Sequence, residues 1–250
     1  MGRKIVSQVA SPDENAAGLI QGTLEPLRYG GQMLDPDEVS GIVTSMIPIG
    51  ARVLEVGCGT GSISQIVRDT CRADVVGIEP DPARAQRAAE RGLKVHTGFL
   101  SLEAIREVGS FDIVLFADVL EHIPNPHAML VMSRDALKPG GAVIVSVPNV
   151  AHWSVRVDLI RGRFRYEPSG IMDATHLRWF TAETARSLIA SAGFRVVDYR
   201  VSVCQGQAFN VKRRPLRWLS PKQRMRLVRL GCRRWPTLFG CQHVFKAEML

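Results

Sequence analysis

Three closely spaced glycines lie in the stretch VLEVGCGTGSIS, between an apolar run and a helix-like segment. Glycine at positions 57, 59 and 61 allows unusual backbone angles and lets a ligand approach the main chain. The dinucleotide-binding pattern GxGxxG requires a further glycine where Ser62 stands, and the sequence has no phosphate-binding loop ending in GKS or GKT. The spacing therefore predicts a ligand-binding loop and argues against an NAD-dependent enzyme.

An acidic residue, Glu79, ends the next apolar run, VVGIEPD. A carboxylate has two acceptor oxygens, and in nucleoside-binding α/β folds an acid at this place accepts both ribose hydroxyls. The alternative is that Glu79 only caps the helix that opens at Asp81 and Pro82. Because the glycine loop lies one helix and one strand upstream, we favour nucleoside binding.

The elements that must position these residues alternate between short apolar runs and helix-like segments. Strands are predicted at ARVLEVG, DVVGIEP, LKVHTG, FDIVLFADV and AVIVSVP, with helix-like segments between them. FRVVDYRVSV and CQHVFKAEM predict two more strands towards the end. This alternation indicates an α/β fold, a doubly wound and mostly parallel sheet with helices on both faces.

Four separate motifs, VLEVGCGTG, VVGIEPDPAR, FDIVLFADVLEHIPNP and LKPGGAVIVSVPN, resemble those of the class I S-adenosylmethionine-dependent methyltransferases over about residues 34–200. The resemblance implies a Rossmann-like sheet of seven strands with the last one antiparallel. It also implies S-adenosyl-L-methionine at the carboxyl ends of the first two strands, with Glu79 on the ribose. The cofactor-binding residues expected from it are Glu55, Gly57, Gly59, Gly61, Glu79, Pro80 and Asp118. The acid that the family usually places after the third strand is missing, because Gly98, Phe99 and Leu100 stand there.

The sequence DVLEH follows the fourth predicted strand and carries Asp118, Glu121 and His122. It is similar to the ExxEH of quinone-type O-methyltransferases, where a divalent metal is implied. Carboxylate and imidazole ligands suit Mg²⁺ or a transition metal. The alternative, which we favour, is that these residues only order the loop and bind no metal.

Residues 149–180 are rich in arginine and aromatic side chains and predict a helical substrate cap. They resemble a methyltransferase branch common in bacterial glycan and cell-surface polysaccharide pathways. His176 and His152 are the first candidates for a catalytic base, with His122 as a third, because imidazole titrates near neutral pH. The alternative is a structural role, in which Asp173, Thr175 and His176 tie the cap to the sheet. The residues expected to bind the acceptor are Asn149, Arg156, Arg163, Tyr166, Asp173 and Arg178.

The net charge of +8 is concentrated in one part of the chain. From Arg200 to the end there are twelve basic residues and one acidic residue, Glu248. This predicts attraction to an anionic membrane surface or a phosphorylated glycan intermediate, with a merely solvated surface as the alternative. We expect no nucleic acid partner. The predicted organisation is an N-terminal extension at 1–33, a methyltransferase domain at 34–203 and a basic tail at 204–250 that completes the sheet.

No apolar run approaches the length of a membrane helix, the N-terminus lacks a signal-peptide core, and the 5 cysteines form no CxxC pair. These features predict a cytoplasmic protein, peripheral to the inner membrane face if the tail binds there. The leading functional expectation is O-methylation of a sugar or other small hydroxylated acceptor in glycan biosynthesis. The alternatives are a quinone or phenolic O-methyltransferase with an apolar acceptor pocket, and a non-catalytic module that binds S-adenosyl-L-methionine.

Overall fold

The computed structural model describes residues 31–203 and 220–250. Seven strands form one sheet in the order β3-β2-β1-β4-β5-β7-β6. The first five strands run parallel, whereas β7 is antiparallel to both of its neighbours. The strands are β1 (Arg52–Val56), β2 (Asp74–Glu79), β3 (Lys94–Thr97), β4 (Phe111–Ala117), β5 (Leu137–Pro148), β6 (Phe194–Val201) and β7 (Gln242–Met249). The predicted seven-stranded, mostly parallel α/β fold is confirmed.

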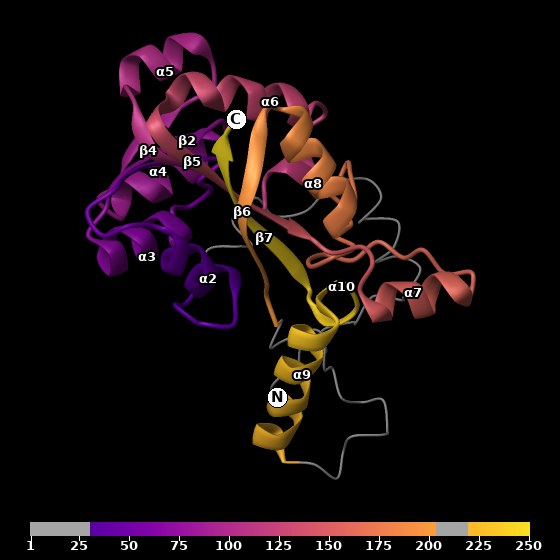
Figure 1. The fold of residues 1–250 in the computed structure, drawn as a ribbon. Coiled ribbons are helices and arrows are strands. Elements are labelled where there is room, and N and C mark those ends of the chain that lie inside the picture. Colours follow the sequence, from indigo (N-terminus) through magenta and orange to yellow (C-terminus); the bar gives the residue numbers. More distant parts are fainter. Residues whose placement is uncertain (1–30, 204–219) are drawn as a thin grey trace, which may run out of the picture.

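Helices cover both faces of this sheet (Figure 1). One face packs against α2 (Val39–Met46) and α3 (Ser62–Cys71), and the other against α5 (Leu102–Val108), α6 (Pro126–Ser133) and α8 (Ala182–Ser191). The remaining helices are α4 (Pro82–Glu90), α7 (Trp153–Ile160), α9 (Pro221–Arg234) and α10 (Pro236–Phe239), with short 3-10 turns η1 (Leu120–His122) and η2 (Arg134–Ala136). No helix in the two described stretches has the length and apolar character needed to cross a bilayer.

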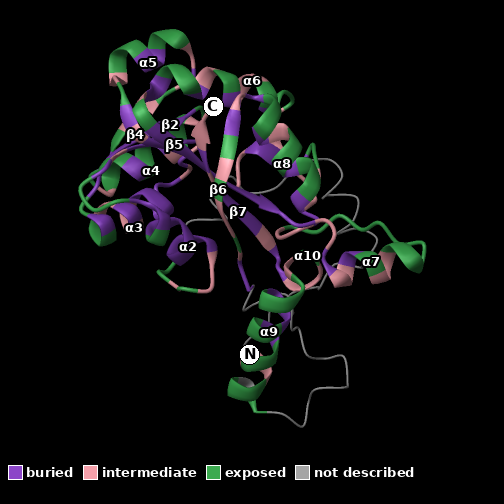
Figure 2. Ribbon diagram, viewed as in Figure 1, coloured by how far each residue is buried: buried purple, intermediate pink, exposed green. Residues whose placement is uncertain are grey.

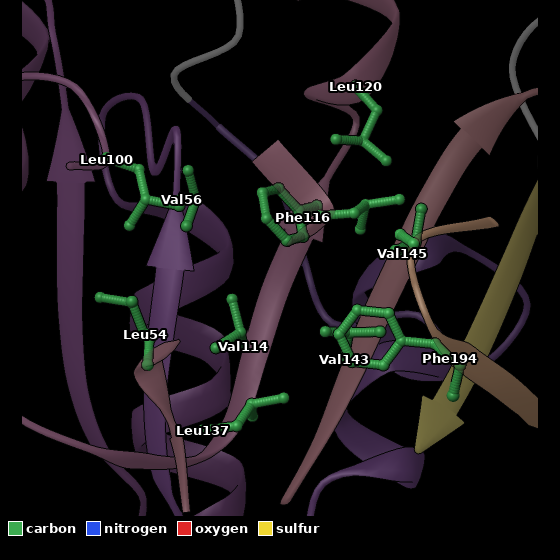
Figure 3. Packing of buried hydrophobic residues seen from close by; sticks show 14 of the residues in the cluster. Leu54, Val56, Leu100, Val114, Phe116, Leu120, Leu137, Val143, Val145 and Phe194 are labelled. Atoms are coloured by element: carbon green, nitrogen blue, oxygen red, sulfur yellow. The ribbon is translucent and has the colours of Figure 1, made fainter. Parts of the chain in front are cut away.

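The larger of the two main cores lies beneath α5, α6 and α8. Figure 3 shows its strand residues, among them Leu54, Val114, Phe116 and Val143, pointing to the same side of the sheet as Phe194. Successive strand side chains point to opposite faces, so Val53 packs into the other core instead. The two cores hold the parallel strands in place on both faces of the sheet, and the site lies at the carboxyl ends of these strands.

Local capping explains where several helices begin. Asp81 accepts a hydrogen bond from the backbone N–H of Arg84, and Pro82 occupies the first turn of α4. Asn125 caps α6 in the same way. Thr181 and Ser220 open α8 and α9 through reciprocal capping boxes. The polar residue at each of these starts therefore sets the direction of the helix that follows.

The segment at 149–180 is less helical than predicted. It contains one helix, α7, followed by irregular chain with an isolated bridge between Glu167 and Asp173. Gly162 and Gly170 adopt positive φ angles of 69° and 94°, which a continuing helix does not permit. The predicted extension is described only from residue 31 onward, and residues 204–219 of the predicted tail lie outside the described residues.

Candidate active site

A cavity of about 830 Å³ opens at the carboxyl ends of the parallel strands. The loops after β1, β2 and β4 contribute Gly57, Glu79 and Asp118 to its wall. Loops that follow adjacent parallel strands meet at one edge of a sheet, which is where α/β folds bind their ligands. Eight of the residues expected to act at the site line it together: Glu55, Gly57, Gly59, Glu79, Pro80, Asp118, His122 and His176. Glu121, considered as a metal ligand, lines it as well.

The three glycines of the loop have different surroundings. A side chain at Gly57 would lie 2.8 Å from Cγ2 of Val119, whereas one at Gly59 would meet nothing within 4 Å. Gly59, with φ 56°, therefore leaves its main chain open to a ligand. Gly61 does not line the cavity, and a side chain there would clash with Leu93 at 2.4 Å. Its role is the close packing of α3, which differs from the ligand contact expected of it.

The buried carboxylate of Glu79 holds the loop in place. Its Oε2 accepts from the Gly59 N–H at 2.8 Å, and its Oε1 accepts from the Asp81 N–H at 3.0 Å. Each carboxylate oxygen keeps a second acceptor site for a ligand hydroxyl. The side chain that caps α4 is Asp81, whereas Glu79 contacts the start of this helix only through the Asp81 N–H.

Glu55 lies behind the loop with its carboxyl group buried. Ser64 Oγ donates a hydrogen bond to it. Burial, offset only in part by this hydrogen bond, raises the pKa of Glu55 to about 8. The carboxyl group is therefore mostly protonated at neutral pH, and a nearby cation would favour its ionised form.

Asp118 occupies a left-handed conformation at φ 55°, directly after β4. Its Oδ1 accepts from Ser146 Oγ and its Oδ2 from Gln242 Nε2, both at 2.6 Å. Burial raises the pKa of this carboxyl group. Both of its oxygens are thus already engaged. Gln242, at the start of β7, was not among the expected site residues. No local sequence pattern indicates that β7 begins near the end of β4.

Glu121, His122 and His176 form a cluster whose candidate ligand atoms all lie within 4.8 Å of one another. Glu121 is 1% exposed, and neither of its carboxylate oxygens has a hydrogen-bond partner among the described residues. His176 Nε2 lies 4.0 Å from Glu121 Oε1. Burial raises the pKa of Glu121 well above its ordinary value, and the charges of Asp118 and Asp173 raise it further. A buried carboxyl group without partners is costly unless something else satisfies it.

The two imidazoles of this cluster are oriented by backbone carbonyls. His122 Nδ1 lies 3.1 Å from the carbonyl oxygen of Thr175, and His176 Nδ1 lies 3.1 Å from that of Ile171. A carbonyl only accepts, so each Nδ1 carries the proton and each Nε2 keeps a lone pair. Such nitrogens can take a proton from an acceptor or bind a cation. The expected trio of Asp118, Glu121 and His122 is therefore changed in one member, with His176 in the place of Asp118.

Three residues expected to act on the acceptor are enclosed away from the cavity. Asn149 donates from Nδ2 to the carbonyls of Thr237 and Gly240, at 2.9 and 2.7 Å. His152 is buried with its Nδ1 2.8 Å from Ser154 Oγ, and burial lowers its pKa to about 4. Asp173 accepts from the hydroxyl and the N–H of Thr175, and it too is buried. The hydrogen bonds of these side chains lie within the cap or join it to the segment before β7.

The other acceptor residues expected from the sequence also lie outside the cavity lining. Arg156 Nε donates to the carbonyl of Ala151, and Arg178 donates to that of Pro124. The Tyr166 ring packs near Phe164 and Trp179, while Arg163 is exposed. These side chains serve the outside of the cap. The cavity is lined instead by residues that no motif marked, including Met33, Met129, Ile171 and Thr175.

Comparison with known proteins agrees with this geometry. A family model described as "Methyltransferase domain" matches residues 28–199. A "Ubiquinone biosynthesis O-methyltransferase" of Xanthomonas axonopodis pv. citri is 34% identical over 121 residues, which is 46% of this chain and 51% of that protein. A relative with the same name from Cereibacter sphaeroides is 31% identical over 176 residues, 68% of this chain and 66% of that protein. The chain thus spans about half to two thirds of these relatives.

Solved structures share the fold at low sequence identity. A SAM-dependent methyltransferase from Thermotoga maritima matches with a TM-score of 0.54 and 20% identity, covering 84% of this chain and 87% of that one. A TehB-like enzyme from Corynebacterium glutamicum matches with a TM-score of 0.53 and 15% identity, covering 95% and 97%. The names of the two sequence relatives, which refer to ubiquinone biosynthesis, give no support to the expected glycan branch. Family and fold imply S-adenosyl-L-methionine as the methyl donor, and the open main chain at Gly59 beside Glu79 suits it. The chain belongs to the methyltransferase domain family.

Proposed function

We propose that this protein transfers the methyl group of S-adenosyl-L-methionine to the hydroxyl of a phenolic, quinone-type acceptor. The observation that carries the proposal is the buried cluster of Glu121, His122 and His176, which opens into the same cavity as the glycine loop. The names of the relatives, which refer to ubiquinone biosynthesis, support this acceptor class over a sugar.

The cofactor end of the cavity is formed by Gly57, Gly59, Glu79 and Asp118. S-adenosyl-L-methionine supplies an activated methyl group on a sulfonium. The second acceptor sites of the Glu79 oxygens would accept the ribose hydroxyls, and the open main chain at Gly59 allows close approach. The protein's task is then to place the acceptor oxygen in line with that methyl group.

The acceptor end has an apolar wall. Met33, Val119, Ile123, Met129 and Ile171 line the cavity. An aromatic ring buries apolar surface against such side chains, whereas a sugar needs polar partners. The arginines expected to serve a sugar or phosphate lie outside the lining. The wall therefore supports an aromatic acceptor.

The cluster can accept the proton that the acceptor's hydroxyl group loses. The Nε2 atoms of His122 and His176 keep lone pairs, and a base within reach of a hydroxyl accelerates its methylation. The same three residues would hold a divalent cation, which would lower the pKa of a bound phenol. The Glu121 carboxyl group, which has no hydrogen-bond partner in the described part of the chain, and the two imidazoles suit such an ion.

A direct test is to incubate the purified protein with S-adenosyl-L-methionine and a panel of acceptors, and to detect methylated products by mass spectrometry. Catechols and hydroxybenzoates represent the phenols, and hexoses and sugar phosphates represent the alternative. We expect products from phenols only. Methylated sugars without methylated phenols would contradict the proposal.

The role of a cation is tested separately. Mn²⁺ is titrated calorimetrically into the metal-free protein and into the Glu121→Gln variant. Binding that is lost in the variant would assign the cluster to a cation. Full activity after treatment with EDTA would instead leave the histidines as the base.

An apolar acceptor also partitions into membranes. We therefore propose in addition that the protein methylates its acceptor at a membrane surface.

A further inference from the structure

Helix α9 carries a row of cations along one side. Lys222, Arg226, Arg229 and Arg233 follow one another at intervals of four, three and four residues, and all four are exposed. At 100° per residue these positions fall within roughly 60° of the helix circumference. The helix contains no acidic residue. We call these four residues the basic stripe.

Packing on another side of the helix leaves the stripe uncovered. Val228 and Cys232 are buried in a small cluster with Val203, against which Phe239 also packs. A side chain at Gly231 would come within 3.1 Å of the Phe239 ring, so α9 approaches α10 closely. The stripe lies roughly 110° round the helix from Val228 and Cys232. Its residues are exposed, with Arg229 at the edge nearer the body, and Figure 2 shows α9 largely exposed below the sheet.

Exposed apolar side chains share the uncovered part of the helix with the stripe. Leu227 is 47% exposed and Leu230 is 60% exposed. Both lie away from the side that carries Val228 and Cys232, with Leu230 next to the cations and Leu227 further round the helix. Trp235, directly after the helix, is 53% exposed. Cations next to exposed leucine and tryptophan are typical of helices that lie at the boundary between lipid headgroups and acyl chains.

The helix is attached to the wall of the cavity. Arg229 donates from Nε to Asp37 at 2.7 Å, and the Val203 N–H donates to the Asp37 carbonyl at 2.8 Å. Neighbouring residues Met33 and Glu38 line the cavity, and Met33 is 83% exposed. A surface that receives α9 would thus lie close to one side of the cavity.

We propose that the outward face of α9 docks onto an anionic lipid bilayer and holds the cavity near acceptors dissolved in it. The charge of the stripe complements anionic headgroups, and Leu227 and Leu230 enter the apolar layer beneath them. A nucleic acid would use the cations but would leave the leucines exposed to water. The reason for docking rests on the proposed acceptor, whereas the docking itself follows from the face of the helix.

The test is co-sedimentation of the whole chain with vesicles of phosphatidylcholine, with and without added phosphatidylglycerol. We expect binding only to the anionic vesicles, weakened by salt. The variant Lys222→Ala/Arg226→Ala/Arg233→Ala spares the Arg229–Asp37 pair and should bind about 100-fold more weakly, at about fivefold per cation. A matched variant, Arg87→Ala/Arg106→Ala/Arg195→Ala, removes the same charge from other exposed sites and should bind as the wild type does.

Leu227→Ser/Leu230→Ser separates a bilayer from a purely ionic partner. It should weaken vesicle binding and leave any binding of single-stranded RNA unchanged. Equal vesicle binding by the wild type and the basic-stripe variant, or tighter binding to RNA than to vesicles, would overturn the proposal. Methylation of a water-soluble catechol without vesicles should be the same in both proteins, so failure of the acceptor assignment remains distinct from failure of docking.

Discussion

The two ends of the cavity are built in different ways. At the cofactor end, Glu55 lies in β1, Gly59 lies in the loop that follows it, and Glu79 ends β2, where its carboxylate accepts hydrogen bonds from the backbone N–H groups of Gly59 and Asp81. At the acceptor end, His122 from the turn after β4 meets Thr175 and His176 from the far side of the cap, which follow it by more than fifty residues. The first end depends on local chain geometry, and the second on the tertiary placement of one irregular segment.

This difference bears on what each end can change. A loop held by main-chain bonds tolerates few substitutions, because glycine angles and a buried carboxylate define it. Side chains on an irregular cap are positioned individually, so their identity can vary without unfolding the sheet. The cofactor end is therefore the constant part of the cavity, and the acceptor end is where specificity is set.

Replacement of the buried carboxyl group at the acceptor end should have the largest effect. We expect Glu121→Gln to lower kcat by about 10²- to 10⁴-fold, because the cluster loses its carboxylate as base partner or ligand. The affinity for S-adenosyl-L-methionine, measured calorimetrically, should stay the same. Glu167→Gln, on the exposed part of the cap, is the matched control. A kcat within threefold of the wild type would mean that the acceptor end lies elsewhere.

The Asn149→Ala variant tests whether Asn149 stabilises the fold or binds the acceptor. Asn149→Ala leaves the buried carbonyl of Gly240 and the partly buried one of Thr237 without their donor, which should lower the free energy of unfolding by about 1–3 kcal/mol. Urea denaturation measures this loss. The KM of the protein that remains folded should not change. A raised KM with unchanged stability would instead return Asn149 to the acceptor site.

At the cofactor end, Glu79→Ala should weaken S-adenosyl-L-methionine binding. Loss of hydrogen bonds to a charged acceptor costs about 1.5–3 kcal/mol, or roughly 10- to 150-fold in affinity. Calorimetric titration gives the value, with Glu90→Ala on the exposed side of α4 as the control. Wild-type affinity in the variant would show that Glu79 only fastens the loop.

The last prediction concerns the pH dependence of stability, of which only the part between pH 6.5 and 8 is measured. The pKa of Glu55 is about 8 in the folded protein against an ordinary 4.5, so between these values the folded state keeps a proton that the unfolded chain has lost. Stability should therefore fall as the pH rises through this window, by up to about 1.4 kcal/mol per pH unit for this group.

Two buried histidines act in the opposite direction at lower pH. Burial lowers the pKa of His152 and His243 from 6.5 to about 4, so stability rises with pH between those values and their effect is complete above 6.5. The contribution of Glu55 is best seen between pH 6.5 and 8. Denaturation curves over that range should decline less steeply for Glu55→Gln than for the wild type. Parallel declines would show that Glu55 is ionised in the folded protein.

The fold and the cofactor end could be predicted from the sequence because their signals are local. Apolar runs gave the strands, and the spacing from the glycine loop to Glu79 spans one helix and one strand. The acceptor end could not be predicted in this way. Whether His152 or His176 reaches the cavity depends on how the cap folds back, and one is enclosed while the other lines the wall. Gln242 likewise depends on the register of β7 against β5.

The position of β7 has a consequence for the order in which the protein takes shape. It is the last of the described strands along the chain, yet it lies inside the sheet, between β5 and β6. While the ribosome is still making the chain, β6 has no partner to join and β5 keeps an open edge. Asp118 also lacks the amide of Gln242 until that point. Completion of the cavity therefore waits until β7 has been made, and until then the open edge of β5 can pair with other chains.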